Sequence, residues 1–281
     1  ALYVVHDVTH LLQPGPNVLG VMLGDGFYRQ NRAWMPGSVH GIPPAGPVYG
    51  EVRLLAELRV TGEGGDAFAL SSDGDWPCAP GPVVENNVYA GETYDARLEQ
   101  PGWAEPGFDH SGWRPVDTIE APCERLEEQV MPPMRRVEEL RPVAIRQTDH
   151  GVYVVDMGQN FAGWARIRVD GPAGQEVRLR FAEEVNGQGG VETASTGVFA
   201  TTVEQVDRFV CDGKGPRTWE PRFTYHGFRY VEVTGWPGEL STNDITGVAV
   251  HTDLPWAGRF ECSCERLNEL HRMAVWTHRS N

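Results

Sequence analysis

Hydrophobic and polar positions change in short runs along most of the chain, and turn residues end each run. In the first part, runs at 18–23, 51–60 and 67–70 predict strands. The run at 18–23 is apolar nearly throughout, as in a buried strand. The stretch TGEGG at 61–65 predicts a hairpin turn between the second and third runs.

Six further runs predict strands in the second part of the chain, at 152–155, 165–169, 176–181, 206–210, 228–233 and 245–250. Clusters of Gly, Asn and Asp separate them, which is turn chemistry. Short strands at such spacing favour a sandwich or jelly roll. The predicted fold class is all-β, with two antiparallel β-sandwich domains that are jelly-roll-like.

The last segment has a different pattern. Apolar positions follow the three-and-four spacing of an amphipathic helix at Leu267, Leu270, His271, Ala274 and Val275. Ser263 is the expected N-cap of this helix. A single helix after an all-β chain cannot bury its apolar stripe alone. We therefore expect it to be the first element of a further, helical domain.

Length and composition set the domain boundaries that we expect. A chain of 281 residues suits about two domains, and its 33 Gly and 21 Pro leave almost no long unbroken window for a helix. We expect an N-terminal β-sandwich at 1–122 and a second β-sandwich at 144–256. A proline-containing linker, or an extended crossing strand, is expected at 123–143, and the start of the helical domain at 257–281.

The formal net charge of -15 would repel a phosphate backbone or an anionic membrane surface, so neither nucleic acid nor membrane is an expected partner. No apolar run reaches the roughly 18 residues of a membrane span. The five cysteines are scattered and odd in number, which favours a cytoplasmic over a secreted location. No signal peptide is visible. The first residues resemble a strand already in progress, however, so we expect the true N-terminus to be missing and leave the compartment undecided.

Three motifs carry a family resemblance: YAGETYDAR at 89–97, DMGQNFAGW at 156–164 and FTYHGFRY at 223–230. Together and in this order they resemble the bacterial α-L-rhamnosidases of glycoside hydrolase family 78. The match extends over nearly the whole chain, from NVLGV at 17–21 to the final helical segment. One small departure is Phe27, which stands where the family usually has Trp.

This resemblance implies an N-terminal β-sandwich, a concanavalin-like β-sandwich and then an (α/α)6 barrel. It also implies removal of terminal α-L-rhamnose with inversion, by two carboxylates of the barrel that are expected downstream of Asn281. No catalytic residue is therefore assigned in this chain, which we expect to be inactive alone. The implied partners are rhamnose-containing glycosides and the chain's own (α/α)6 domain. The alternative is a stand-alone lectin-like module that binds carbohydrate.

The densest group of oxygen ligands comprises Glu85, Asn86, Asn87, Glu92 and Asp95. Carboxylate and amide oxygens suit a calcium ion or sugar hydroxyls, and Glu85, Asn87, Glu92 and Asp95 are the candidate calcium ligands. The resemblance implies that some N-terminal modules of the family bind rhamnose with calcium. The alternative is that Glu92 and Asp95 hydrogen-bond turns and pair with Arg97. No other cofactor is expected.

Two further groups are candidates for carbohydrate or interdomain contact. Asp25, Tyr28, Asn31 and Trp34 form a polar-aromatic loop, which suits a sugar's apolar face and hydroxyls but also suits plain packing. The other group comes from the second and third motifs. In the second motif, two glycines are surrounded by Asp156, Gln159, Asn160 and Trp164, and the third motif contains Tyr225 and Arg229. These residues either line a substrate cleft or dock against the next domain, and both interpretations remain open.

Overall fold

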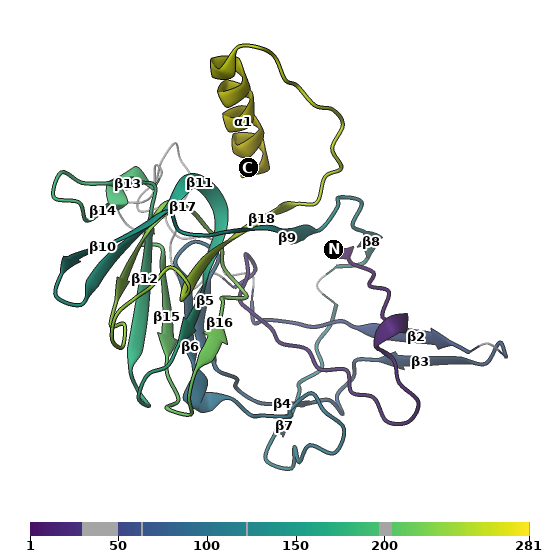
Figure 1. Cartoon of the computed structure of the whole chain (residues 1–281). Coiled ribbons are helices and arrows are strands. Elements are labelled where there is room, and N and C mark those ends of the chain that lie inside the picture. The colour runs from purple at the N-terminus through teal and green to yellow at the C-terminus, as the bar shows by residue number, and fades with distance from the viewer. Residues whose placement is uncertain (30–49, 63, 122, 197–203, 281) are drawn as a thin grey trace. The chain divides into compact units, whose positions relative to one another are not determined.

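The structure is a computed structural model that describes residues 1–29, 50–62, 64–121, 123–196 and 204–280. The chain divides into two compact units, each described here by itself (Figure 1). Unit 1 comprises Ala1–Gly24, Glu51–Gly81 and Glu99–Met131. Unit 2 comprises Asp25–Gly50, Pro82–Leu98 and Pro132–Asn281. Residues 82–98, which the sequence analysis placed in the first domain, thus cluster with unit 2; the domain boundaries themselves stay a prediction.

Unit 2 is built on one sheet of ten strands. Its order is β5 (Val83–Asn87), β6 (Gly91–Asp95), β15 (Val206–Val210), β12 (Glu176–Ala182), β17 (His226–Thr234), β11 (Val152–Val169), β18 (Ile245–Thr252) and β9 (Met134–Leu140), with β10 (Ala144–Asp149) and β16 (Arg217–Trp219) also on β11. Neighbours are antiparallel except β6 and β15, which are parallel. The predicted strands at 176–181, 206–210, 228–233 and 245–250 are confirmed.

The central strand β11 corrects one prediction. The sequence indicated two strands separated by a turn, whereas β11 runs for 18 residues, with a register shift between Asp156 and Phe161 where it pairs with β17. Pairing with β17 resumes at Phe161, and Gly163 then lies between His226 of β17 and Ala249 of β18. A Cβ at Gly163 would lie 1.9 Å from the carbonyl oxygen of Val248, so this approach requires glycine.

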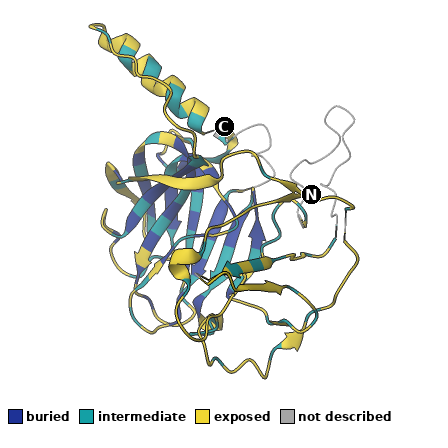
Figure 2. Ribbon diagram, turned by 90° about the vertical axis from the view of Figure 1, so that its right-hand side faces the viewer, coloured by how far each residue is buried: buried dark blue, intermediate teal, exposed yellow. Residues whose placement is uncertain are grey.

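The sheet curls around one large hydrophobic core, and a small second cluster is formed by Val154, Ala182 and Val191. Alternate residues of β12, Val177, Leu179 and Phe181, are buried, while Arg178 and Arg180 between them lie on the opposite face. Buried residues from both halves of β11 join this core, for example Val155 and Ile167. Figure 2 shows the buried positions gathered in the strands of this sheet. The all-β fold class is therefore confirmed.

Unit 1 consists of short strand pairs. β2 (Glu57–Thr61) pairs with β3 (Ala67–Ser71), which confirms the predicted hairpin. β4 (Pro77–Cys78) pairs with β7 (Arg114–Pro115), and β1 (Leu2–Tyr3) pairs in parallel with β8 (Glu127–Glu128). None of the described residues of unit 1 is fully buried.

The buried strand predicted at 18–23 is wrong. These residues form no strand, and Val18, Leu19, Val21 and Leu23 are exposed. An apolar run becomes a strand only where a neighbouring strand accepts its backbone hydrogen bonds, and no described strand pairs with it. A local aromatic contact exists nearby in unit 1, where Trp103 stacks on Trp113 with 6.3 Å between ring centroids.

The predicted C-terminal helix is confirmed as α1 (Glu265–Arg279). Its N-cap is Cys264 and not Ser263, and no side chain caps the first turn. Leu267 and Leu270 of the apolar stripe remain 50% and 58% exposed, while Trp276 packs against the core of the sheet. Among the described residues, no helix is both long enough and apolar enough to cross a lipid bilayer.

The remaining elements are short. They are the strand pair β13 (Glu184–Val185) and β14 (Val191–Glu192), and the 3-10 helices at Thr9–Leu11, Ala96–Leu98 and Thr193–Ser195. Strand β9 lies within the expected linker at 123–143 and pairs with β18. The segment was expected to be a linker or an extended crossing strand, and residues 134–140 form an extended strand.

Candidate functional site

An exposed aromatic cluster lies in unit 2, formed by Phe27, Tyr89 and Tyr225. Their exposed fractions are 59%, 38% and 37%. The rings of Phe27 and Tyr89 meet edge to face with 5.9 Å between centroids. Partial burial raises the pKa of the Tyr89 hydroxyl, and the neighbouring Tyr225 raises it further. Tyr225 follows Thr224, whose hydroxyl binds the carbonyl oxygen of Val88, next to Tyr89, at 3.1 Å. Three segments that are distant in sequence thus supply neighbouring aromatic side chains, a surface that suits the apolar face of a sugar.

Two asparagines of the predicted ligand group hold the backbone next to this cluster. The Oδ1 of Asn86 accepts a hydrogen bond of 2.7 Å from the backbone N–H of Asp25. The Oδ1 of Asn87 accepts from the backbone N–H groups of Tyr89 and Ala90, at 2.9 and 3.0 Å. Asn86 and Asn87 are both buried, so their observed contacts fix the hairpin and the loop that carry the aromatic side chains.

The β5–β6 hairpin also takes part in a buried network of polar side chains. Glu92 is 1% exposed, and its Oε2 accepts hydrogen bonds of 3.0 Å from the backbone N–H groups of both Arg222 and Phe223. The N–H of Glu92 donates to Oδ1 of Asp207 at 3.0 Å, and the Nε2 of His226 lies 3.0 Å from the same oxygen. These bonds join the β5–β6 hairpin to the start of β17.

Burial disfavours the charged form of Glu92 and raises its pKa to about 7, although the two backbone N–H groups act in the opposite direction. Gly91 permits the close approach of the hairpin to β15. Its φ is 111°, and a Cβ there would lie 2.0 Å from the carbonyl oxygen of Val206. The hydroxyl of Thr224 donates to the carbonyl oxygen of Val88 at 3.1 Å and ties the two segments a second time.

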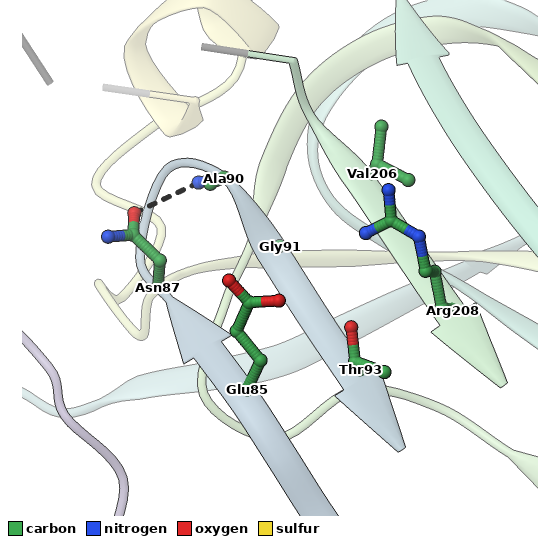
Figure 3. Close-up of a pocket in the computed structure, with 7 residues that line it drawn as sticks. All are labelled: Glu85, Asn87, Ala90, Gly91, Thr93, Val206 and Arg208. Carbon is green, nitrogen blue, oxygen red and sulfur yellow. Dashed lines mark hydrogen bonds between the residues drawn. The ribbon is translucent and has the colours of Figure 1, made fainter. Parts of the chain in front are cut away.

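The opposite face of the same strands carries a small polar pocket. Glu85 of β5, Thr93 of β6 and Arg208 of β15 are paired across the sheet, so their side chains project from one face (Figure 3). The pocket is completed by Asn87, Ala90, Gly91 and Val206. Figure 3 also shows the bond from Ala90 to the Oδ1 of Asn87 at the hairpin tip.

The four candidate calcium ligands do not converge in this arrangement. Glu92 accepts backbone bonds on the core face, and Glu85 lines the pocket on the other face. Asp95 pairs with Arg97 at 2.6 Å, as one of the two interpretations expected, and this bond lowers the pKa of Asp95. Within the described ranges, no three His, Cys, Asp or Glu side chains are grouped to hold a metal ion. These carboxylates therefore do not meet at one point in this structure, and calcium binding stays a prediction.

The second motif places its candidates apart from the aromatic cluster. Asp156 accepts two hydrogen bonds from the guanidinium of Arg229, at 2.8 and 2.9 Å, which lower the pKa of Asp156. Asn160 donates to Glu183 at 2.7 Å. The guanidinium of Arg229 also lies over the ring of Tyr230, 5.0 Å from its centroid. Asp156 and Arg229 thus form a local ion pair that spans β11 and β17.

Trp164 belongs to a separate group of charged residues. Its Nε1 donates to Glu220 at 3.1 Å, and Arg166 and Arg136 bind the same carboxylate at 2.9 and 2.5 Å. Of the other candidates, Gln159 has a buried Nε2 atom without a hydrogen-bond partner, and Tyr28 adjoins Phe27 in the loop. Asn31 and Trp34 lie outside the described residues.

The structure therefore brings Asp25, Asn86, Asn87, Glu92 and Tyr225 into one region and leaves the second motif elsewhere. Tyr89 and Asp207 were not among the predicted site residues. A signal for Tyr89 exists in the first motif, where an aromatic residue stands at a hairpin tip between Asn87 and Gly91. No local signal marks Asp207, whose role depends on β15 lying beside β6.

The curled, almost entirely antiparallel sheet of unit 2 defines an all-β domain. Residues 1–138 match the family model described as the α-L-rhamnosidase N-terminal domain, and residues 146–251 match the bacterial α-L-rhamnosidase concanavalin-like domain. The chain belongs to the bacterial α-L-rhamnosidases of glycoside hydrolase family 78, as its motifs indicated.

Individual relatives agree with this assignment. The α-L-rhamnosidase of Streptomyces avermitilis is 40% identical over 280 residues, which is 99% of this chain and 26% of that protein. Its crystal structure, complexed with L-rhamnose, has a TM-score of 0.80 over 91% of this chain and 24% of that chain. The Aspergillus terreus α-L-rhamnosidase structure is 38% identical, with a TM-score of 0.82 over 92% of this chain and 29% of that chain. The chain thus spans less than a third of the length of these relatives.

Proposed function

We propose that this chain forms the non-catalytic N-terminal part of a glycoside hydrolase that releases terminal α-L-rhamnose with inversion. An inverting mechanism needs two carboxylates roughly 6.5–9.5 Å apart, one to protonate the leaving group and one to activate water. The four buried carboxylates of the described residues already have partners. Glu92 binds backbone N–H groups, Asp207 faces His226, and Asp212 and Glu232 pair with Arg217 and Arg180. The acid and the base are therefore expected outside these residues.

Within the whole protein, we propose two roles for this part, to brace the catalytic (α/α)6 domain and to contact rhamnose-containing glycosides. The observation that supports the second role is the exposed aromatic cluster of Phe27, Tyr89 and Tyr225, which three separate segments assemble. An exposed aromatic surface flanked by backbone and amide groups matches a sugar, which has an apolar face and a rim of hydroxyls.

Hydrolysis tests the first part of the proposal. The purified 281-residue chain is incubated with an aryl α-L-rhamnoside, and release of the aryl group is followed by absorbance. We expect no turnover above buffer, because the four buried carboxylates of the described residues are already bound by other groups of the chain. Turnover that survives further purification would contradict the assignment of this part as non-catalytic.

Titration with L-rhamnose tests the second part. We expect Tyr225→Ala to weaken binding about three- to tenfold, since an aromatic contact is worth about 0.5–1.5 kcal/mol. The matched control is Phe68→Ala, an aromatic of unit 1 that is 58% exposed and not in the cluster. A chelator should leave the affinity unchanged, because the candidate calcium ligands do not converge.

The other outcomes of this titration support different functions. Equal loss in both variants, or no binding by the unmodified chain, would reduce this part to a scaffold. Weaker binding of L-rhamnose in the presence of the chelator would instead support a metal-dependent, lectin-like site.

A further inference from the structure

Glu92 is buried, whereas the residues of the aromatic cluster are exposed. Its side chain lies on the core face of β6, while Tyr89 stands at the tip of the β5–β6 hairpin. The backbone that Glu92 binds, at Arg222 and Phe223, leads within two residues to Tyr225. One carboxylate oxygen thereby connects the segment that carries one cluster tyrosine to the hairpin that carries another.

The contacts of Glu92 show which of its atoms does this. Oε2 accepts from both backbone N–H groups, whereas Oε1 is buried and has no hydrogen-bond partner among the residues that the structure describes. A buried polar atom without a partner costs free energy, and an apolar side chain of similar size would avoid that cost. What the carboxyl group adds is the pair of bonds to residues 222 and 223. The only other side-chain bond described between these two segments is the one from Thr224 to Val88.

We infer that Glu92 is a positioning residue for the aromatic cluster: its carboxyl group fixes the backbone at Arg222 and Phe223 and so holds Tyr225 beside Tyr89. The relevance of this positioning to carbohydrate rests on the proposed function; the positioning itself rests on the contacts alone. Loss of the acceptor leaves two backbone N–H groups unbound, and the segment is then held by the Thr224 hydroxyl and, one residue after Tyr225, by the contact of His226 with Asp207. Tyr225 then moves away from Tyr89.

Two variants of Glu92 separate this role from general stability. Glu92→Gln keeps a side-chain oxygen that can accept, and Glu92→Leu removes it at similar volume. The matched control is Asp95→Asn on the same strand, which weakens only the ion pair with Arg97. Hydrogen exchange is measured by NMR at the amides of Arg222 and Phe223, with the amide of Val231 in the core of β17 as the internal reference.

We expect Glu92→Leu to speed exchange at residues 222 and 223 at least about tenfold relative to Val231, and to shift the ring signals of Tyr225 and Tyr89. Glu92→Gln should restore protection and ring signals close to those of the unmodified chain at about pH 6, and Asp95→Asn should change neither. If Glu92→Leu does not fold, amide exchange at residues 222 and 223 is instead compared between Glu92→Gln and the unmodified chain at about pH 8. A carboxylate there accepts more strongly than an amide, so both amides exchange faster in the variant by a smaller factor.

Two results would overturn the inference: unchanged exchange at residues 222 and 223, or faster exchange of equal size at Val231. L-rhamnose titration of the same variants separates this question from the proposed function. Weaker binding in Glu92→Leu that is rescued in Glu92→Gln supports both. Absence of binding by the unmodified chain, with the expected exchange pattern, defeats the carbohydrate role and leaves the positioning role standing.

Discussion

The hairpins β2–β3 in unit 1 and β5–β6 in unit 2 are locally similar, since each joins two five-residue antiparallel strands. In each hairpin, one side chain has the opposite burial to the one that its polarity predicts. Phe68 of β3 is 58% exposed, whereas Glu92 of β6 is 1% exposed. The difference is a neighbour: β6 pairs with β15, and no described strand extends β2–β3. Burial in this chain therefore depends on which strand pairs with a further strand. Side-chain polarity agrees with burial only where a core has formed.

The same contrast separates the two units as wholes. Unit 2 buries a continuous core, while the described residues of unit 1 include none that is fully buried. Hydrophobic burial is the main favourable term in folding, so the stability of the isolated chain should come almost entirely from unit 2. Four substitutions test this difference between the units, from the largest expected effect to the smallest.

The largest effect is expected from a core aromatic of unit 2. Phe228 is 0% exposed and contacts Phe161 and Phe181, with 4.5 and 4.7 Å between ring centroids. Phe228→Ala should lower the free energy of unfolding by about 3–5 kcal/mol. Phe68→Ala in unit 1 should change it by less than about 0.5 kcal/mol. Urea unfolding measures both, and equal losses would contradict the assignment of stability to unit 2.

The next effect is a pH dependence that comes from Glu92. Its pKa in the folded chain is raised from an ordinary 4.5 to about 7, so between these values the folded chain retains a proton that the unfolded chain has lost. The stabilisation is complete below pH 4.5 and is lost as the pH rises through about 7, a change of about 3 kcal/mol. Glu92→Gln should remove this part of the slope in unfolding free energy, measured between about pH 5 and 8. An unchanged slope would show that other groups cause it.

A backbone effect should follow. Gly91→Ala in unit 2 combines a positive φ with a Cβ placed 2.0 Å from the carbonyl oxygen of Val206, and we expect a loss of about 2–3 kcal/mol. Gly107→Ala in unit 1 is the matched control. Its φ is +88°, but nothing lies within 4 Å of the added carbon, so only about 1 kcal/mol of strain is expected. Thermal unfolding measures both variants. Equal losses of unfolding free energy would argue against the close contact between the hairpin and Val206.

The smallest effect concerns the ion pair of Asp156 and Arg229, which is partly exposed to water. Asp156→Asn should lower the free energy of unfolding by no more than about 1 kcal/mol at neutral pH. The pKa of Asp156 is lowered in the folded chain, so this contribution is present above its ordinary value of 3.8 and fades as the pH falls through the folded value. A larger loss at neutral pH, or one that persists in strong acid, would mean that Asp156 supports the register shift in β11 through contacts other than this ion pair.

Local pattern was enough to predict the all-β class, the β2–β3 hairpin, several strands of the large sheet and the C-terminal helix. These elements depend on periodicities of two and of three to four residues, which a sequence displays directly. The motifs were enough to indicate the rhamnosidase family. They were not enough to define the site, because Asn87, Glu92 and Asp95 are close in sequence yet face different partners.

Only the tertiary structure decided which residues share a surface and which apolar runs are buried. The apolar run at 18–23 has the composition of a core strand and lies exposed, while Glu92 has the composition of a surface residue and lies in the core. Backbone pairing explains both, because a strand is buried only when another strand satisfies its hydrogen bonds and covers its face. The chain's sequence therefore determined its elements and family, and the pairing of β6 with β15 determined where the aromatic cluster and its buried support would form.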